Sequence, residues 1–313
     1  MTPSPPLRIG TRGSRLALAQ TADVRDRLIA AHPALAAPGA VEIVVIRTTG
    51  DTVQDRPLAE IGGKGLFTRE IDDAMLAGRI DIAVHSVKDV PTWLPDGIAM
   101  PCILPREDPR DAFICSKAAR LADLPAGAVV GTASLRRQAQ VLGRRPDLMV
   151  TLLRGNVETR LKRIADGVID ATLLAIAGLK RLGMAGAAVA VIDPDEMLPA
   201  VGQGAIGVTA RTGDERAAGL LAAVDDADSA VCVAAERALL AVLDGSCRTP
   251  IGGLAVVTES KQLFLRGLLA HPDGSRLVTV ERRGARTDAV ALGEDAGRDL
   301  LARFGPGFPD QGR

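Results

Sequence analysis

The feature that most constrains the fold is a repeated alternation of short β-rich runs with amphipathic helical patterns over the first two thirds of the chain. Strands are expected at residues 7–11, 41–47, 80–84, 128–131, 148–153 and 169–174. Helices are expected at residues 14–31, 67–77, 135–142 and 157–165. Alternation of this kind indicates an α/β fold, with βαβ units around a mostly parallel sheet.

Prolines divide this alternation into two similar blocks. Five prolines between residues 91 and 109 separate the blocks, and a Pro- and Gly-rich crossing at residues 193–204 is expected to return the chain to the first block. The two blocks are therefore expected to form a discontinuous first α/β domain, residues 1–104 and 205–222, and a second α/β domain, residues 105–204.

The last part of the chain has a different pattern. A helix is expected at residues 229–243 and another at 287–304, with three β-like runs between them at 252–258, 262–270 and 277–282. Pro272-Asp273-Gly274 forms a turn signal between two of these runs. We expect a small α+β domain at residues 223–313, with a three-stranded antiparallel sheet.

The composition limits the kinds of ligand. The 313 residues have a net charge of zero, with 38 basic and 38 acidic residues, and they include no Tyr, one Trp and five Phe. Single-stranded nucleic-acid sites and aromatic cages need aromatic walls, and nucleic-acid or anionic-membrane partners favour a basic excess. We therefore expect neither partner. Only six of the basic residues are lysines, so the placement of the arginines becomes the main question.

Arginines gather at three predicted junctions between a strand and a helix, residues 11–14, 131–137 and 154–160. Each junction has a plausible N-cap, namely Ser14, Ser134 or Asn156. Helix N-termini attract anions, and arginine matches carboxylate or phosphate with its planar fork. Three such junctions predict a polyanionic small molecule. The alternative is that Arg136 and Arg137 pair with nearby acids or lie on a solvated helix face.

The cation Lys88 and the acid Asp89 are adjacent in the sequence and follow an apolar run. An acid in this place can stabilise developing positive charge or take part in proton transfer. The alternative is a surface ion pair in a turn before Pro91. His85 lies inside the apolar run, so we expect it to be a packing residue rather than a base.

Two glycine-rich segments resemble nucleotide motifs but lack their context. Residues 62–65 fail the P-loop test because Gly65 follows Lys64 where Ser or Thr is required, so we expect a glycine-hinged lid. Residues 202–207 match the letters of the dinucleotide fingerprint, but a strand rather than a helix is expected to follow them. We treat this second match as accidental.

The four cysteines show no C-x-x-C spacing, which favours reduced thiols over a zinc or disulfide framework. Cys102, Cys115 and Cys232 lie in apolar runs and are expected to be buried. Cys247 lies in a Gly- and Pro-bounded loop beside Arg248, which would favour the thiolate. A lone loop cysteine is more often incidental than functional, so further evidence is needed to assign it a role.

Taken together, these motifs resemble the porphobilinogen deaminase (hydroxymethylbilane synthase) family. The resemblance covers nearly the whole chain, with matching segments in the family's order at residues 7–12, 62–67, 85–91, 106–113, 131–137, 153–160, 173–183, 198–204 and 245–253. It implies that the first two domains are similar to periplasmic binding proteins and that the third carries the cofactor.

The resemblance also implies an activity. Members of the family are transferases of heme and tetrapyrrole biosynthesis that join four porphobilinogen molecules head to tail, with loss of ammonia, on a dipyrromethane primer. Water then releases hydroxymethylbilane. By this resemblance Cys247 attaches the dipyrromethane covalently, Asp89 is the catalytic carboxylate, and Lys64 and Phe67 belong to a mobile loop. No metal is implied. The acetate and propionate groups of cofactor and substrate are expected to bind Arg12, Ser14, Lys64, Lys88, Thr132, Ser134, Arg136, Arg137, Arg154, Arg160, Arg181 and Gln203.

Two other functions fit part of the sequence. A non-catalytic solute-binding protein would explain the two α/β blocks and the carboxylate-binding arginines, but not the third domain or Cys247. A thiol hydrolase would pair Cys247 with His85. No run approaches the roughly 20 apolar residues of a membrane span, and the first residues lack a signal-peptide pattern. We therefore expect a cytoplasmic protein without a membrane partner, and the family resemblance favours a monomer.

Overall fold

The computed structural model describes residues 5–52, 65–243 and 249–305. These residues divide into two compact units. The first unit comprises residues 5–52, 65–107 and 205–230, and the second comprises residues 108–204, 231–243 and 249–305. The division into three domains that the sequence suggests stays a prediction. Within the described residues, no helix is both long and apolar enough to cross a membrane.

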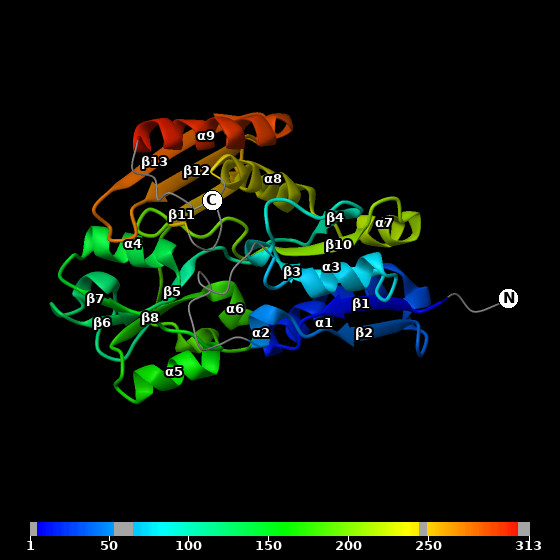
Figure 1. The fold of residues 1–313 in the computed structure, drawn as a ribbon, viewed down its shortest axis with the longest axis horizontal. Coiled ribbons are helices and arrows are strands. Elements are labelled where there is room, and N and C mark those ends of the chain that lie inside the picture. The colour runs from blue at the N-terminus through cyan, green and yellow to red at the C-terminus, as the bar shows by residue number, and fades with distance from the viewer. Residues whose placement is uncertain (1–4, 53–64, 244–248, 306–313) are drawn as a thin grey trace. The chain divides into compact units, whose positions relative to one another are not determined.

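The first unit is built on a five-stranded sheet with the order β2-β1-β3-β10-β4 (Figure 1). Its strands are β1 (Leu7–Thr11), β2 (Val41–Val45), β3 (Ile82–Ser86), β4 (Ile98–Ile103) and β10 (Ile206–Arg211). Strand β1 pairs in parallel with β2 and β3, whereas β10 pairs antiparallel with β3 and β4. The expected return of the chain after residue 204 is confirmed, because β10 is inserted between β3 and β4.

Helices cover both faces of this sheet. Helices α1 (Arg15–Ala31) and α7 (Glu215–Ala222) pack on one face, and α3 (Arg69–Leu76) packs on the other. Side chains alternate along a strand, so Ile82 and Val84 enter the core under α1 while Ala83 enters the core under α3. Three short elements complete the unit, namely α2 (Thr49–Thr52) and the 3₁₀ turns Pro33–Ala36 and Val87–Asp89.

The second unit contains a sheet of the same design, with the order β7-β6-β8-β5-β9. Its strands are β5 (Asp111–Cys115), β6 (Val129–Gly131), β7 (Met149–Thr151), β8 (Ala171–Ala175) and β9 (Ala190–Val191). Strand β6 pairs in parallel with β7 and β8, and β5 pairs antiparallel with β8 and β9. Helix α4 (Leu135–Arg144) packs on one face, and α5 (Val157–Ala165) and α6 (Ile176–Arg181) pack on the other. Two 3₁₀ turns cover Leu121–Asp123 and Ala185–Ala187.

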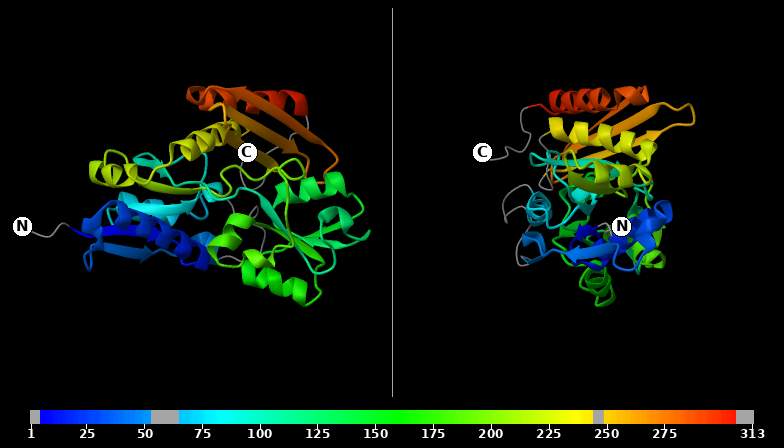
Figure 2. Two further views of the ribbon diagram at one scale, coloured as in Figure 1. Left: turned by 180° about the vertical axis from the view of Figure 1, so that it is seen from behind. Right: turned by 90° about the vertical axis from the view of Figure 1, so that its right-hand side faces the viewer.

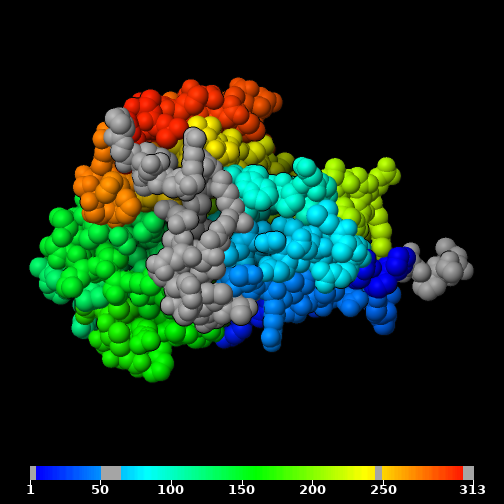
Figure 3. All heavy atoms as spheres, viewed as in Figure 1, coloured from blue at the N-terminus to red at the C-terminus, as the bar shows by residue number. Residues whose placement is uncertain are grey.

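The second unit also includes the predicted three-stranded antiparallel sheet, β11-β12-β13. Its strands are β11 (Ile251–Val257), β12 (Leu263–Ala270) and β13 (Leu277–Gly284). Helices α8 (Ala227–Val242) and α9 (Ala289–Phe304) pack together on one face of this sheet (Figure 2). Gly293 permits their close approach, because a Cβ there would collide with the Ala235 carbonyl. The side of α9 that faces away from the sheet is exposed to solvent (Figure 3). A 3₁₀ turn at Arg286–Asp288 precedes α9.

The α/β fold class and the antiparallel third sheet are confirmed, but the expectation of mostly parallel sheets is wrong. Each five-stranded sheet has two parallel and two antiparallel pairings. The sequence interpretation treated residues 91–109 as a separator, whereas β4 lies within this stretch and β5 follows it directly. Pro101 fits inside β4 because that strand forms an edge of its sheet, where a missing N–H is tolerated.

Candidate functional site

In the first unit, the predicted binding residues follow the carboxyl end of β1. Arg12 comes directly after the strand, and the Ser14 hydroxyl accepts a hydrogen bond of 3.2 Å from the Ala17 N–H. Ser14 is therefore the N-cap of α1, as predicted. Its hydroxyl supports the helix end at the place where an anion would meet the free N–H groups.

A small cavity joins this junction to the end of β3. Its volume is about 50 Å³, and Arg12, Ser14, Phe67, His85 and Asp89 are among the side chains that line it. The Arg12 guanidinium carbon lies 4.1 Å from the centre of the Phe67 ring, which is a cation–π contact. The structure thus brings the proposed catalytic acid and the first predicted cation to one cavity.

Asp89 and Lys88 lie in the 3₁₀ turn that follows β3, Val87–Asp89. Strand β3 begins and ends two residues later than predicted, so the strand includes His85 and Ser86. Lys88 is exposed and Asp89 is half-buried. The acid is therefore held at the carboxyl edge of the sheet by a short turn, and it remains accessible from the cavity.

His85 is a buried packing residue, as predicted. Its Nε2 atom lies 3.0 Å from the Thr209 hydroxyl on the neighbouring β10. Burial lowers the pKa of His85 to about 4, and the positive charge of Arg12 adds to the effect. The ring is neutral near pH 7, and its low pKa makes it a poor general base for a hydrolase.

In the second unit, two more helices begin with the predicted caps. The Ser134 hydroxyl accepts a hydrogen bond of 3.4 Å from the Arg137 N–H at the start of α4. The Asn156 side chain accepts one of 2.8 Å from the Thr159 N–H at the start of α5. The hydroxyl of Thr132 accepts a bond of 3.1 Å from the Ser134 N–H and so fixes the turn before α4. All three N-cap predictions are confirmed.

Arg136 and Arg137 are buried and pair with the same carboxylate, Asp111. The ion pairs measure 2.8 Å from Arg136 and 2.7 Å from Arg137. Burial alone would raise the pKa of Asp111, but the two guanidinium charges outweigh it and hold this pKa well below the usual range. The alternative that these arginines pair with a nearby acid is therefore confirmed, whereas their binding of a ligand carboxylate stays a prediction.

Gln203 joins the same group of side chains. Its amide nitrogen donates a hydrogen bond of 2.9 Å to Asp111 and another of 2.7 Å to the Pro109 carbonyl. Strand β10 follows residues 202–207, so the match to the dinucleotide motif is accidental, as predicted. Gln203 therefore connects the crossing before β10 to the first residue of β5.

Two further arginines repel Arg160 on α5. Burial and repulsion from Arg137 and Arg154 lower the pKa of Arg160 to about 10. A bound carboxylate would relieve this repulsion, so the cluster fits a ligand that carries several carboxylates. Arg181 lies at the end of α6 and donates a hydrogen bond of 2.8 Å to the Gly204 carbonyl.

Two predicted site residues, Lys64 and Cys247, lie outside the residues that the structure describes. The other three cysteines are buried, as predicted, and burial raises the pKa of Cys102 to about 12. A thiol in that state is unreactive. Within residues 5–52, 65–243 and 249–305, no group of His, Cys, Asp and Glu side chains could hold a metal ion.

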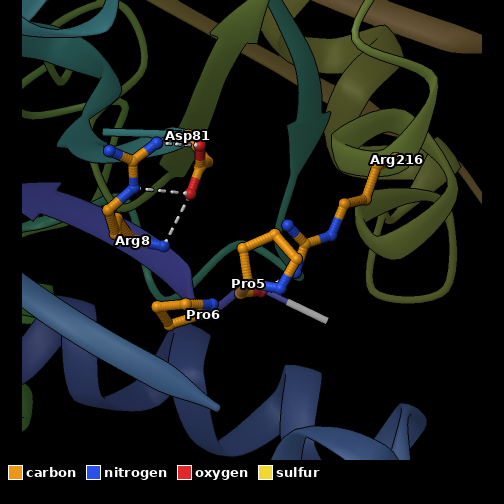
Figure 4. Close-up of a pocket in the computed structure, with 5 residues that line it drawn as sticks. All are labelled: Pro5, Pro6, Arg8, Asp81 and Arg216. Carbon is orange, nitrogen blue, oxygen red and sulfur yellow. Dashed lines mark hydrogen bonds and ion pairs between the residues drawn. The ribbon is translucent and has the colours of Figure 1, made fainter. Parts of the chain in front are cut away.

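A larger cavity, of about 380 Å³, lies near the beginning of β1 and β3. This is the edge of the first sheet opposite to the one that carries Arg12 and Asp89. The cavity is lined by Pro5, Pro6, Arg8, Asp81 and Arg216 (Figure 4). Arg8 already holds Asp81 through two side-chain hydrogen bonds of 2.7 and 3.2 Å. In open α/β sheets ligands bind beyond the carboxyl ends of the strands, so we assign no site here.

Asp111 is the residue that the sequence interpretation missed. The acid opens an apolar run, Asp-Ala-Phe-Ile-Cys, and an acid at the start of a buried strand needs a partner. The acid before an apolar run could therefore have indicated a buried ion pair. The sequence interpretation did not use it, because residues 91–109 were taken as a separator between the two blocks. Nothing in the local sequence indicates which cations are the partners of Asp111.

Comparison with known proteins identifies two family models in the chain. Residues 7–219 match "porphobilinogen deaminase, dipyromethane cofactor binding domain", and residues 230–302 match "porphobilinogen deaminase, C-terminal domain". The chain is 58% identical over 306 residues to chloroplastic porphobilinogen deaminase of Oryza sativa subsp. japonica, covering 97% of this chain and 86% of that protein. It is 59% identical over 308 residues to porphobilinogen deaminase of Paracoccus denitrificans, covering 98% of this chain and 97% of that protein.

Similar solved structures include periplasmic binding proteins. The aliphatic sulphonate binding protein SsuA from Escherichia coli has a TM-score of 0.42 and 14% identity, and the match covers 76% of this chain and 70% of that one. The methionine binding protein MetQ has a TM-score of 0.43 and 12% identity, with coverages of 70% and 87%. These TM-scores are too low to bear on function.

Proposed function

Because the chain belongs to the porphobilinogen deaminase family, we propose that it performs the family's reaction with Asp89 as the catalytic carboxylate and Cys247 as the cofactor attachment point. The chain is a transferase of tetrapyrrole and heme biosynthesis. It joins four porphobilinogen molecules head to tail with loss of ammonia and releases hydroxymethylbilane. The solute-binding alternative is not favoured, since both family models and the similar curated proteins are deaminases.

The observation that supports the role of Asp89 most directly is its place in the same cavity as Arg12 and Ser14. A pyrrole that carries two carboxylates can be held by a guanidinium and a helix N-terminus while its reacting carbon faces Asp89. Loss of ammonia leaves positive charge on the substrate, and a fixed carboxylate stabilises that charge. His85 lines the same cavity and is neutral near pH 7, so it adds no positive charge that would repel the cationic substrate.

Phe67 limits access to this cavity. A volume of about 50 Å³ is far smaller than the roughly 300 Å³ or more of typical ligand pockets. The Phe67 ring covers the guanidinium of Arg12, which a substrate carboxylate would need to reach. We infer that the ring moves away from Arg12 when substrate binds.

The second unit fits the cofactor and the growing chain. The family model that matches residues 7–219, which belong to both units, is a dipyrromethane cofactor binding domain, and dipyrromethane supplies the pyrrole carbon to which the first substrate is joined. Its acetate and propionate groups suit the cations that repel one another around Arg160. In this proposal Arg137, Arg154 and Arg160 bind carboxylates, and Thr132, Ser134, Arg136, Arg181 and Gln203 complete the binding surface. Lys88 adds a cation in the turn after β3, and Lys64, which lies outside the described residues, is proposed as a further carboxylate-binding residue.

An assay of Asp89→Asn tests the catalytic role. The wild-type protein should convert porphobilinogen to hydroxymethylbilane, and the variant should turn over about 100-fold more slowly, because it cannot stabilise the developing cation. Asp96→Asn, an exposed acid in the following loop, is the matched control and should keep full turnover. Full turnover by Asp89→Asn would overturn the residue assignment, and absence of product from the wild type would overturn the function.

We also propose that the protein works as a monomer in the cytoplasm, without nucleic-acid or membrane partners. The neutral charge balance and the scarcity of aromatic side chains, with one Trp, five Phe and no Tyr, support the absence of a nucleic-acid partner. Sedimentation of the purified chain at several concentrations would test the monomer, and a mass that rises with concentration would contradict it.

A further inference from the structure

Asp111 lies at the edge of the second sheet where a ligand is expected, although it begins a strand instead of ending one. Strand β5 runs antiparallel to β8, and Asp111 is paired with Ala175, the last residue of β8. The first residue of an antiparallel strand therefore shares an edge with the carboxyl ends of the parallel strands. The Asp111 side chain is completely buried there.

Three of the predicted carboxylate-binding side chains converge on this one acid. Its Oδ1 atom accepts hydrogen bonds of 2.7 Å from Arg137 Nη2 and 2.9 Å from Gln203 Nε2. Its Oδ2 atom lies 2.8 Å from Arg136 Nη1. These three partners come from α4 and from the crossing before β10, so Asp111 joins segments that are far apart in the sequence.

The contacts fix one edge of the Arg137 guanidinium. Both Nε, at 3.3 Å, and Nη2, at 2.7 Å, donate to Asp111 Oδ1. Within residues 5–52, 65–243 and 249–305, Nη1 of Arg137 has no hydrogen-bond partner. A guanidinium held along one edge still presents its other edge to a second carboxylate.

The charges around Asp111 leave a positive excess. One carboxylate faces two buried guanidinium groups, and Arg137 in turn repels Arg160. Without the acid, Arg136 and Arg137 would be two like charges in a buried site, and each would move to reduce that repulsion. The acid thus fixes the position of the cations without cancelling their attraction for an anion.

We propose that Asp111 is a positioning residue that holds Arg137, together with Gln203, in the orientation that binds a carboxylate of the substrate. This proposal rests on the proposed function for the identity of the ligand. Gln203 uses its amide nitrogen to donate to Asp111 and Pro109, and Arg136 also donates a bond of 2.7 Å to the Leu198 carbonyl. These bonds make the arrangement rigid.

The first test compares Asp111→Asn with Asp170→Asn in steady-state kinetics with porphobilinogen. Asp170 is the matched control, because it precedes β8 at the opposite edge of the same sheet and pairs with Lys117 at 2.7 Å. We expect Asp111→Asn to raise KM about tenfold or more, since a charge-assisted contact no longer orients Arg137. Asp170→Asn should lower Tm without changing KM.

A merely structural role would give a different result. Partial unfolding of Asp111→Asn would reduce the active fraction and hence the apparent kcat, while the KM of the remaining folded enzyme would stay the same. An unchanged or lowered KM for Asp111→Asn would therefore overturn the proposal.

The second test is made on the wild-type protein and its measurement does not depend on turnover. Hydrogen exchange of the Arg137 Nε–H in ¹⁵N-arginine-labelled wild-type protein, assigned with Arg137→Lys, reports its bond to Asp111. We expect exchange about tenfold or more slower than that of the exposed Arg163 Nε–H. Equal exchange at the two positions would overturn the proposal. Slow exchange in a wild-type protein that makes no product would instead refute the proposed function and leave the positioning intact.

Discussion

The two five-stranded sheets have the same strand arrangement but carry different charged groups at the edge formed by the carboxyl ends of their parallel strands. In the first unit, the antiparallel strand β10 begins with Ile206, and the charged groups there are the accessible Asp89 and Arg12 beside a neutral His85. In the second unit, the corresponding strand β5 begins with Asp111, which holds two buried arginines. One fold thus presents an accessible acid on one sheet and fixed cations on the other.

This difference suits a division of labour. An acid that stabilises positive charge must be reachable by the substrate, whereas cations that hold carboxylates bind best when their orientation is fixed before the ligand arrives. The first sheet therefore fits the chemical step, and the second fits retention of a chain whose carboxylates increase with each addition.

The largest expected effect comes from weakening the cation cluster of the second sheet. Arg160→Gln removes a guanidinium whose pKa of about 10 reflects burial and repulsion from Arg137 and Arg154. We expect KM for porphobilinogen to rise about tenfold to 100-fold, because charge-assisted hydrogen bonds contribute about 1.5–3 kcal/mol. The measurement is steady-state turnover over a range of substrate concentrations.

Arg163→Gln is the control for this change, since Arg163 is exposed on the same helix. Its KM should be within twofold of wild type by the usual effect of surface substitutions. Equal increases in KM for the two variants would mean that the charge of the helix as a whole, and not the fixed cluster, attracts the substrate.

The second effect concerns the neutral imidazole of the first sheet. His85 has a folded pKa of about 4 against an ordinary value of 6.5, so the unfolded chain takes up a proton between these values while the folded chain does not. Its stabilising contribution is thus present above pH 6.5 and is lost as the pH falls toward 4. From pH 7 to pH 5 we expect a loss of about 2 kcal/mol in the free energy of unfolding.

Urea unfolding at pH 7 and pH 5 measures this loss. In His85→Gln the difference between the two pH values should shrink by about 2 kcal/mol relative to wild type. If the variant kept the full wild-type pH dependence, the acid sensitivity would belong to other groups, and His85 would not be a buried neutral residue.

The smallest effect contrasts two buried acids. Asp72 on α3 of the first unit has a pKa raised to about 6, because burial penalises its charge and Asp73 repels it, with only a bond to Thr68 acting in the other direction. Asp111 in the second unit has a lowered pKa because two arginines face it. Removing the charge should therefore stabilise the fold at Asp72 and destabilise it at Asp111.

For Asp72→Asn we expect a gain of about 1 kcal/mol in the free energy of unfolding at pH 8. The folded protein retains the Asp72 proton between about pH 4 and 6, so the gain should disappear near pH 4. Thermal unfolding at both pH values measures it, with Asp96→Asn, an exposed acid outside α3, as control. A destabilised Asp72→Asn at pH 8 would show that the ionised carboxylate is favourable in its place.

Local patterns predicted the parts of the fold that depend on neighbouring residues. The bounds of β1 and α5, the three N-caps, the burial of three cysteines and the third antiparallel sheet all follow from periodicity and cap chemistry. Helices such as α6 and α7 were not predicted, because their short apolar runs look the same as strand or loop.

The rest depends on long-range pairing that a local pattern does not contain. The direction of β5 is set by its pairing with β8, which lies more than fifty residues away in the chain, and this direction places Asp111 beside the carboxyl end of β8. Likewise, Arg12 contacts Phe67 and His85 contacts Thr209 only after the sheet has formed. The sequence identified the candidate cations, and the structure shows what holds them.

The intact mass of the purified 313-residue chain shows whether the protein carries its cofactor on Cys247. We expect the wild-type protein to be heavier than its sequence by one dipyrromethane, that is, by two pyrrole units with their acetate and propionate groups. Cys247→Ser should have the mass of its sequence alone, whereas Cys232→Ser, which alters a buried cysteine, should keep the addition. An unmodified wild-type mass would show that the chain carries no covalent cofactor, and an addition that persists in Cys247→Ser would show that Cys247 is not the attachment point.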